Sequence, residues 1–178
     1  MRLIVMGVSG CGKSTLAVAI AARLGLEMVD GDDLHLPQSV EKMRKGTALE
    51  DADRWPWLDR IGAYLAQAPA ASPGRVVACS ALKRAYRERI RAQAGGAVCF
   101  VFLQGDFDLI EKRLQQRAGH YMPPGLLASQ FQALEAPQAD ETDVITLAIS
   151  APVEALVEQA FFNLQPGLHA ARRTPAGH

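Results

Sequence analysis

Short apolar runs alternate with segments of helical periodicity along this chain. Five runs have the length of buried strands, and the run at 98–103 is apolar throughout, as in a parallel sheet covered on both faces. The expected strands are residues 3–6, 27–29, 76–79, 98–103 and 144–149. Strands that alternate with helices indicate a parallel sheet with helices on both faces. We therefore expect one α/β domain built on a five-stranded parallel sheet.

Apolar residues three or four positions apart mark the helices between these strands. Leu16, Ile20 and Leu24 share one face of the first helix, which Gly25 ends. Pro56 fits the first turn of a later helix, because proline at that place loses no intrahelical hydrogen bond. Further helical patterns cover about residues 38–46, 82–90, 107–114 and 153–161.

The length of 178 residues fits a single domain. We place this domain at 1–164 and a tail without apolar pattern at 165–178. Nineteen Lys and Arg residues balance nineteen Asp and Glu, which argues against a general binder of nucleic acid or of membrane surfaces. No apolar run approaches the roughly 20 residues of a transmembrane helix. Cys11, Cys79 and Cys99 lack CxxC spacing, so we expect free thiols in a cytoplasmic protein.

A phosphate-binding motif, GxxxxGK[ST], occupies residues 7–14 between an expected strand and an expected helix. Its glycines let successive backbone N–H groups point at phosphates, and the helix N-terminus adds its positive end. Lys13 supplies a mobile charge for the β- and γ-phosphates, and Ser14 supplies a hydroxyl for Mg²⁺. The motif predicts a nucleoside triphosphate as ligand. The expected nucleotide-binding residues of the loop are Gly7, Val8, Ser9, Gly10, Cys11, Gly12, Lys13, Ser14 and Thr15.

Two carboxylates, Asp30 and Asp32, flank a glycine where the second expected strand ends, the edge at which open α/β sheets bind ligands. One can orient Mg²⁺ through its waters, and the other can accept the proton of an attacking hydroxyl. The Asn-Lys-x-Asp motif of a GTPase is absent, since Asn163 is the single asparagine. The third expected strand ends in Cys79-Ser80, without the carboxylate usual in a motor or transport ATPase. The pattern favours a small kinase, with a solvated acidic turn as the alternative.

Basic side chains near the same edge are candidates for binding an anionic acceptor. Arg54 lies just before a Trp-Pro-Trp sequence, and Lys83 follows the end of the third expected strand. Guanidinium and ammonium groups in that crevice would pair with a carboxylate. Trp57 is interpreted as a packing residue. Solvated helix faces are the alternative for the basic residues.

A segment rich in glycine and proline, residues 118–125, follows two arginines that share a helix face, Arg113 and Arg117. Hinge-competent residues beside an arginine predict a mobile lid that closes over the phosphates and expels water. A surface salt bridge is the alternative for the arginines. His120 either contacts ligand from this lid or is an exposed loop histidine.

Several stretches in fixed order carry a family resemblance. They are Gly-Val-Ser-Gly-Cys-Gly-Lys-Ser (7–14), Asp-Gly-Asp-Asp-Leu-His (30–35), Glu-Lys-Met (41–43), Asp-Arg-Trp-Pro-Trp-Leu (53–58), Cys-Ser-Ala-Leu-Lys (79–83), Tyr-Arg (86–87), Gly-Asp-Phe-Asp (105–108), Arg-Ala-Gly-His-Tyr-Met (117–122) and Ser-Gln-Phe-Gln-Ala-Leu-Glu (129–135). This combination is much more specific than the phosphate loop alone. Over residues 3–164 the chain resembles bacterial-type gluconokinases, P-loop kinases related to shikimate and adenylate kinases.

The resemblance implies phosphorylation of D-gluconate at its 6-hydroxyl by ATP with Mg²⁺, and often a homodimer. It also implies a substrate-binding region at about 35–75 and a lid at about 117–130. Asp30 and Ser14 resemble the metal-side residues, and Asp32 resembles the acid that faces the acceptor hydroxyl. The expected substrate-binding residues are Asp32, His35, Arg54, Lys83 and His120. The expected nucleotide-side arginines are Arg113 and Arg117. The expected catalytic residues are Lys13, Asp30, Asp32 and Arg117.

Two other functions fit the same nucleotide-side residues. A kinase for another small anion, such as shikimate or a different sugar acid, would differ only in its acceptor contacts. A nucleotide-dependent switch that has lost transfer chemistry is the alternative from another class, although Lys13, Ser14, Asp30 and Asp32 are all present.

Overall fold

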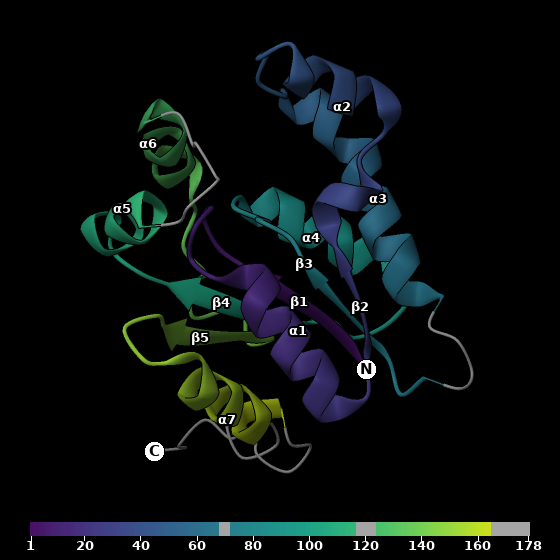
Figure 1. Ribbon diagram of the computed structural model, residues 1–178. Helices are drawn as coiled ribbons and strands as arrows, with labels where there is room; N and C mark the ends of the chain where they lie inside the picture. The colour runs from purple at the N-terminus through teal and green to yellow at the C-terminus, as the bar shows by residue number, and fades with distance from the viewer. Residues whose placement is uncertain (68–71, 117–123, 165–178) are drawn as a thin grey trace, which may run out of the picture.

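Five parallel strands form one sheet in the order β2-β3-β1-β4-β5 (Figure 1). The computed structural model describes residues 1–67, 72–116 and 124–164. The strands are β1 (Arg2–Met6), β2 (Glu27–Asp30), β3 (Arg75–Ala78), β4 (Cys99–Gln104) and β5 (Val144–Ala148). All neighbouring strands pair in parallel. The expected five-stranded parallel sheet is confirmed.

Helices lie between the strands and after them. They are α1 (Lys13–Leu24), α2 (Pro37–Arg44), α3 (Asp51–Ala66), α4 (Arg84–Gln93), α5 (Phe107–Gln115), α6 (Pro124–Ala133) and α7 (Val153–Leu164), with a short 3₁₀ helix, η1 (Gly31–Leu34). None of the helices in the described ranges has the length and apolar character needed to span a bilayer.

The expected start of α3 is wrong. The helix begins at Asp51, so Pro56 lies inside it rather than in its first turn. Glu50 and Asp53 form a reciprocal capping box that satisfies the first backbone N–H groups at this earlier position. A capping box therefore decides where the helix starts, and the helix accommodates the proline ring on an exposed face.

Alternate residues of the sheet face two separate cores. Leu3 and Val5 of β1 pack with α1 and α7, whereas Ile4 and Met6 pack with α3 and α4. All four side chains are fully buried. In Figure 1, α1 and α7 cover one face of the sheet and α3 and α4 the other. This two-sided covering is why the central strands are apolar at all positions except the terminal residues Arg2, Arg75 and Gln104.

A buried ion pair joins α4 to the segment before β5. Arg87 donates from Nε and Nη2 to the two carboxylate oxygens of Glu141, at 2.7 and 2.6 Å. The Arg87 side chain is fully buried, and Arg91 adds a third hydrogen bond to Glu141 at 2.9 Å. The hydrogen bonds from Arg87, opposed by burial and reinforced by Arg91, lower the pKa of Glu141 to about 2.

The same arginine fixes the chain that leads into α4. Nη1 of Arg87 lies within hydrogen-bond distance of three backbone carbonyl oxygens, those of Ala81, Leu82 and Glu135. Ala81 has a positive φ of 42°, a conformation that costs energy for alanine. Arg87 therefore holds the strained loop after β3, and through it Lys83, the N-cap residue of α4.

Replacement of Glu141 should destabilise the fold in a pH-dependent way. Glu141→Gln removes one partner of a buried ion pair, which we expect to lower the free energy of unfolding by about 3 kcal/mol near pH 7. Because folding lowers the pKa from 4.5 to about 2, the ionised carboxylate stabilises the fold fully above the unfolded value. This contribution is lost as the pH falls through the folded value. Urea unfolding of both proteins near pH 7 and near pH 3 measures the difference.

The matched control is Glu88→Gln on α4, where an exposed pair with Arg84 is replaced. Exposed pairs contribute less than about 1 kcal/mol, so this variant should unfold nearly as the parent does. A stability loss in Glu141→Gln that is the same at both pH values would contradict the role of the ionised pair.

Candidate active site

The phosphate-binding motif forms the turn between β1 and α1. Gly7 has a φ of 141°, and a Cβ there would lie 2.9 Å from both Leu103 O and Cys11 Sγ, so only glycine fits this close packing. The Lys13 ammonium donates to Val8 O at 3.1 Å and so folds back over the loop. Since α1 begins at Lys13, its N-terminus lies directly at the end of the loop. The arrangement presents backbone N–H groups and one cation to an anion, as the motif predicts.

A hydroxyl and a carboxylate meet beside this loop. Ser14 Oγ donates to Asp30 Oδ2 at 2.7 Å across 16 residues of sequence. The other oxygen of Asp30 accepts a hydrogen bond from Asp32 N at 3.1 Å, which caps η1. Hard oxygen donors of this kind suit Mg²⁺. The structure therefore brings the two expected metal-side residues together.

This pair fits a metal that is shared with a nucleotide rather than a protein cage. Across the described ranges no group of three or more His, Cys, Asp or Glu side chains could enclose an ion. Mg²⁺ in kinases keeps several waters and takes one or two protein oxygens together with phosphate oxygens. Ser14 and Asp30 supply that number.

Asp32 lies next to the metal-side pair at the carboxyl edge of the sheet. Desolvation raises the pKa of Asp32, and the charge of Asp30 raises it further, while His35 and Lys13 lower it. Because 88% of the Asp32 side chain is exposed, solvent limits both of these contributions. A carboxylate with a raised pKa that accepts no hydrogen bond from the described residues suits proton transfer.

Trp57 supports the acidic turn, the short segment that carries Asp30, Gly31 and Asp32. Trp57 is buried, as expected for packing, and its Nε1 also donates to Gly31 O at 2.7 Å. A Cβ at Gly31 would lie 2.7 Å from Ala78 O, so the turn packs directly on the end of β3. The sequence interpretation of Trp57 missed this hydrogen bond, which holds the turn between the two carboxylates.

His35 lies behind Asp32 and stacks on Trp57, with ring centroids 4.3 Å apart. Only 6% of its side chain is exposed, and its Nε2 is 3.9 Å from Asp32 Oδ1. Burial lowers the pKa of His35, although Asp32 partly opposes this, so the ring is neutral near pH 7. The structure thus places His35 against the acidic turn, and its expected contact with substrate stays a prediction.

The two expected acceptor cations come together around one carboxylate. Lys83 Nζ donates to both oxygens of Asp51, at 2.9 and 2.7 Å, and Arg54 Nη1 lies 3.4 Å from the same side chain. Tyr86 completes the cluster by donating its hydroxyl to Asp51 at 2.5 Å. The hydrogen bonds from Lys83 and Tyr86 lower the pKa of Asp51.

Sequence reasoning missed Asp51 and Tyr86 as members of this cluster. The spacing of Asp51 and Arg54, three residues apart on a helix, was an available signal. Lys83 and Tyr86 join them because α3 and α4 pack against each other, although Asp51 and Lys83 are 32 positions apart. No local pattern reports that packing.

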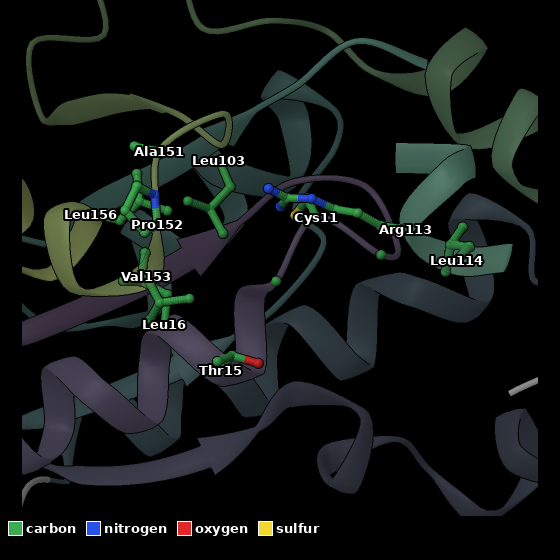
Figure 2. A pocket seen from close by; sticks show the side chains of 12 residues that line it. Cys11, Thr15, Leu16, Leu103, Arg113, Leu114, Ala151, Pro152, Val153 and Leu156 are labelled. Carbon is green, nitrogen blue, oxygen red and sulfur yellow. The ribbon is translucent and has the colours of Figure 1, made fainter. Parts of the chain in front are cut away.

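A pocket of about 250 Å³ lies beside the phosphate loop, where α1, α5 and α7 come together (Figure 2). It is lined by Gly10, Cys11, Gly12, Thr15, Leu16, Leu103, Arg113, Leu114, Ala151, Pro152, Val153 and Leu156. Arg113 extends from α5 past Cys11, and its Nη2 donates to Ile149 O at 2.6 Å. A mostly apolar wall beside one arginine suits a flat aromatic base. Arg113, expected on the nucleotide side, therefore lies in a place consistent with that role.

One contact to the phosphate loop was not expected. Gln130 of α6 accepts a hydrogen bond from Ser9 N at 2.6 Å through Oε1. The stretch around it, residues 129–135, contributed to the resemblance without any role for this residue. Gln130 thus adds a side chain from a distant helix to the loop.

Two expected site residues lie outside the described residues. These are Arg117 and His120, together with the first part of the expected lid at 117–130. The remainder of that range belongs to α6. The roles of both side chains stay predictions.

Comparison with known proteins agrees with this geometry. Residues 3–137 match the family described as an AAA domain. The thermosensitive gluconokinase of Escherichia coli (strain K12) is 42% identical over 156 residues, covering 88% of this chain and 83% of that protein. The gluconokinase of Gluconobacter oxydans (strain 621H) is 48% identical over 139 residues, covering 78% of each chain.

Solved structures show the same relationship. A gluconokinase from Sinorhizobium meliloti 1021 superposes with a TM-score of 0.81 and 41% identity, covering 96% of this chain and 91% of that one. A shikimate kinase from Aquifex aeolicus shares the fold, with a TM-score of 0.58 at 14% identity over 94% of this chain and 98% of that one.

The two carboxylates of the acidic turn should differ in their effect on metal-dependent binding. Asp30→Ala removes the partner of Ser14, so we expect it to weaken binding of Mg-nucleotide by about tenfold. Binding of the nucleotide without Mg²⁺ should be unchanged. Asp32→Ala, the matched variant two residues away, should keep the full gain from Mg²⁺. Calorimetric titration with and without Mg²⁺ measures both, and equal losses in the two variants would contradict the assignment.

Proposed function

The chain belongs to the gluconokinase family of P-loop kinases, and we propose that it transfers the γ-phosphoryl group of ATP to the 6-hydroxyl of D-gluconate. The products are 6-phospho-D-gluconate and ADP. The observation that carries the proposal is the position of Asp32, which is exposed and two residues from the metal-side Asp30. The relatives that carry the gluconokinase name support the choice of acceptor.

The nucleotide side rests on the loop and the neighbouring pocket. The base would occupy the pocket at Arg113, and the phosphates would accept hydrogen bonds from the loop N–H groups. Lys13 would leave Val8 O to neutralise the β- and γ-phosphates. Ser14 and Asp30 would hold Mg²⁺, which supplies further positive charge to the phosphates when bound.

Transfer itself needs a base and a position for the attacking oxygen. Asp32 would accept the proton of the 6-hydroxyl as that oxygen forms its bond to phosphorus and the bond to ADP breaks. Trp57 holds the turn through Gly31, so that Asp30 and Asp32 keep fixed places relative to each other. Arg117 is proposed to stabilise the charge of the transferring group from a lid at about 117–130.

The acceptor carboxylate is proposed to bind the cationic cluster. Arg54 and Lys83 both contact Asp51, which leaves this group of three side chains with one net positive charge. A second carboxylate, that of gluconate, would compensate this charge. His35 and His120 are proposed as further contacts within a substrate-binding region at about 35–75 and the lid. The balance of one carboxylate against two cations supports an anionic acceptor.

Cell location and assembly belong to the same proposal: the cysteine pattern supports the first, and the family resemblance supports the second. We propose a cytoplasmic enzyme with one catalytic domain at 1–164, a tail at 165–178, and assembly as a homodimer. The three cysteines, Cys11, Cys79 and Cys99, are free thiols in the structure, as expected for a reducing compartment.

The proposed reaction is tested by ADP release from Mg-ATP with a panel of acceptors. We expect saturable turnover with D-gluconate and background rates with shikimate, glucose, glycerate and AMP. Turnover with another acceptor alone would keep the kinase and overturn gluconate. ATP binding without turnover for any acceptor would indicate a nucleotide switch.

Variants on the acceptor side should separate binding from chemistry. Arg54→Ala removes a guanidinium that we propose hydrogen-bonds the carboxylate of gluconate. We therefore expect the KM for gluconate to rise by about tenfold or more, with little change in the KM for ATP. Asp32→Ala removes the base, and kcat should fall by roughly 10² to 10⁴ with ATP affinity retained. Steady-state kinetics with each substrate varied measures both.

The control for Arg54→Ala is Arg89→Ala, which removes an exposed arginine of α4 that pairs with Asp59 instead of Asp51. Its kinetic constants should match those of the parent. An unchanged KM for gluconate in Arg54→Ala would remove Arg54 from the clamp, and near-normal turnover in Asp32→Ala would remove Asp32 as the base.

A further inference from the structure

A glutamine from α6 contacts the phosphate loop through both of its polar atoms. Gln130 Oε1 accepts from Ser9 N at 2.6 Å, and Gln130 Nε2 lies 3.4 Å from Ser9 Oγ. The two residues are 121 positions apart, and both are half-buried. The loop N–H groups are the donors that the motif presents to phosphates. Gln130 therefore accepts a hydrogen bond from Ser9 N, a donor that a bound phosphate would also use.

The contact lies at the end of the loop that handles the terminal phosphate. Lys13 Nζ, the cation for the β- and γ-phosphates, contacts the carbonyl of Val8, next to Ser9. The pocket suited to the base is lined by the following residues, Gly10 to Gly12, and not by Ser9. Ser9 and Gln130 are thus on the side of the loop away from the base.

The helix that carries Gln130 is held in place at several points. Leu127 of α6 is buried in the core that α1 and α7 share. After α6, Glu135 N donates to Leu82 O at 2.9 Å, and the Glu135 carboxylate accepts from Arg84 N at 2.6 Å. These bonds attach the end of α6 to the start of α4. Gln130 is therefore carried by an anchored helix and not by a loop.

A carboxamide can exchange roles in a way that a carboxylate does not. A phosphate oxygen and Gln130 Oε1 are both acceptors and compete for the one hydrogen on Ser9 N. When a phosphate oxygen takes that hydrogen, the amide group still has Nε2, a donor of two hydrogens, to offer to the phosphate. A glutamate at this position would place a negative charge next to the negatively charged phosphate and would offer it no hydrogen-bond donor.

On the proposed ATP site, we propose that Gln130 is a nucleotide-contacting residue that recognises the terminal phosphate. Its Oε1 releases Ser9 N to a γ-phosphate oxygen, and its Nε2 donates to the same phosphoryl group. No bond is made or broken in this exchange apart from hydrogen bonds. Gln130 therefore favours the triphosphate over the diphosphate, which assists loading of ATP and release of ADP.

The test compares binding of a diphosphate and a triphosphate by the same proteins. Calorimetric titrations use Mg-ADP and the Mg-complex of the β,γ-imido analogue of ATP, with the parent, Gln130→Ala and Gln130→Glu. We expect Gln130→Ala to bind the analogue about tenfold more weakly and to bind ADP within twofold of the parent. Gln130→Glu should weaken the analogue further, because its charge repels the γ-phosphate.

The matched control is Gln132→Ala, which removes an exposed glutamine from the same helix. It should leave both affinities and the melting temperature unchanged. Equal weakening of ADP and the analogue by Gln130→Ala would show a merely structural contact and overturn the proposal. Tighter binding of the analogue would identify Gln130 as a competitor of phosphate, which also overturns it. Because no acceptor is present, failure of the gluconate assignment would appear only in turnover and not in these titrations.

Discussion

The central strand β1 is the constraint on which the rest of the structure depends. Its residues Leu3–Met6 are fully buried, and it pairs in parallel with β3 on one side and β4 on the other. Parallel strands end at the same edge, so whatever follows β1, β2 and β3 must meet there. The phosphate loop, the acidic turn and the loop before Lys83 follow these three strands. Their proximity is a consequence of strand pairing before any polar contact forms.

Two groups of hydrogen-bonded polar side chains lie at this edge. Asp30 is joined to Ser14 on the phosphate side, while Asp51 is shared by Lys83 and Arg54 on the other side. Among the described residues, none donates a hydrogen bond to the carboxylate of Asp32, and desolvation together with the charge of Asp30 raises its pKa. Lys13 brings positive charge to the phosphate loop, and Lys83 with Arg54 leaves one net positive charge around Asp51, while Asp32 is the base that we propose. This division suits transfer between two negatively charged substrates.

Two long-range links join the parts of the site that lie on different layers. Arg87 ties the loop after β3 to the chain beyond α6 through carbonyl hydrogen bonds and to Glu141 through a buried ion pair. Gln130 ties α6 to the phosphate loop. The same short stretch of chain, from Gln130 to Glu135, therefore contacts both the nucleotide side and the start of α4 that carries the acceptor side. The desolvation of both charges opposes the stability that this buried ion pair adds, but its hydrogen bonds hold the two segments in a defined geometry.

The sequence by itself determined the features whose causes are local. Strand and helix periodicity set the five-stranded parallel sheet, and the eight consecutive residues of the phosphate loop, with Asp30 and Asp32 at a strand end, predicted the phosphate and metal side. The start of α3 escaped because its capping box, Glu50 with Asp53, outweighed the proline signal. Only the tertiary structure decided the cluster around Asp51 and the contact of Gln130 with the loop. Both depend on how helices distant in sequence pack, and packing energy depends on shape in three dimensions, which no spacing along the chain records.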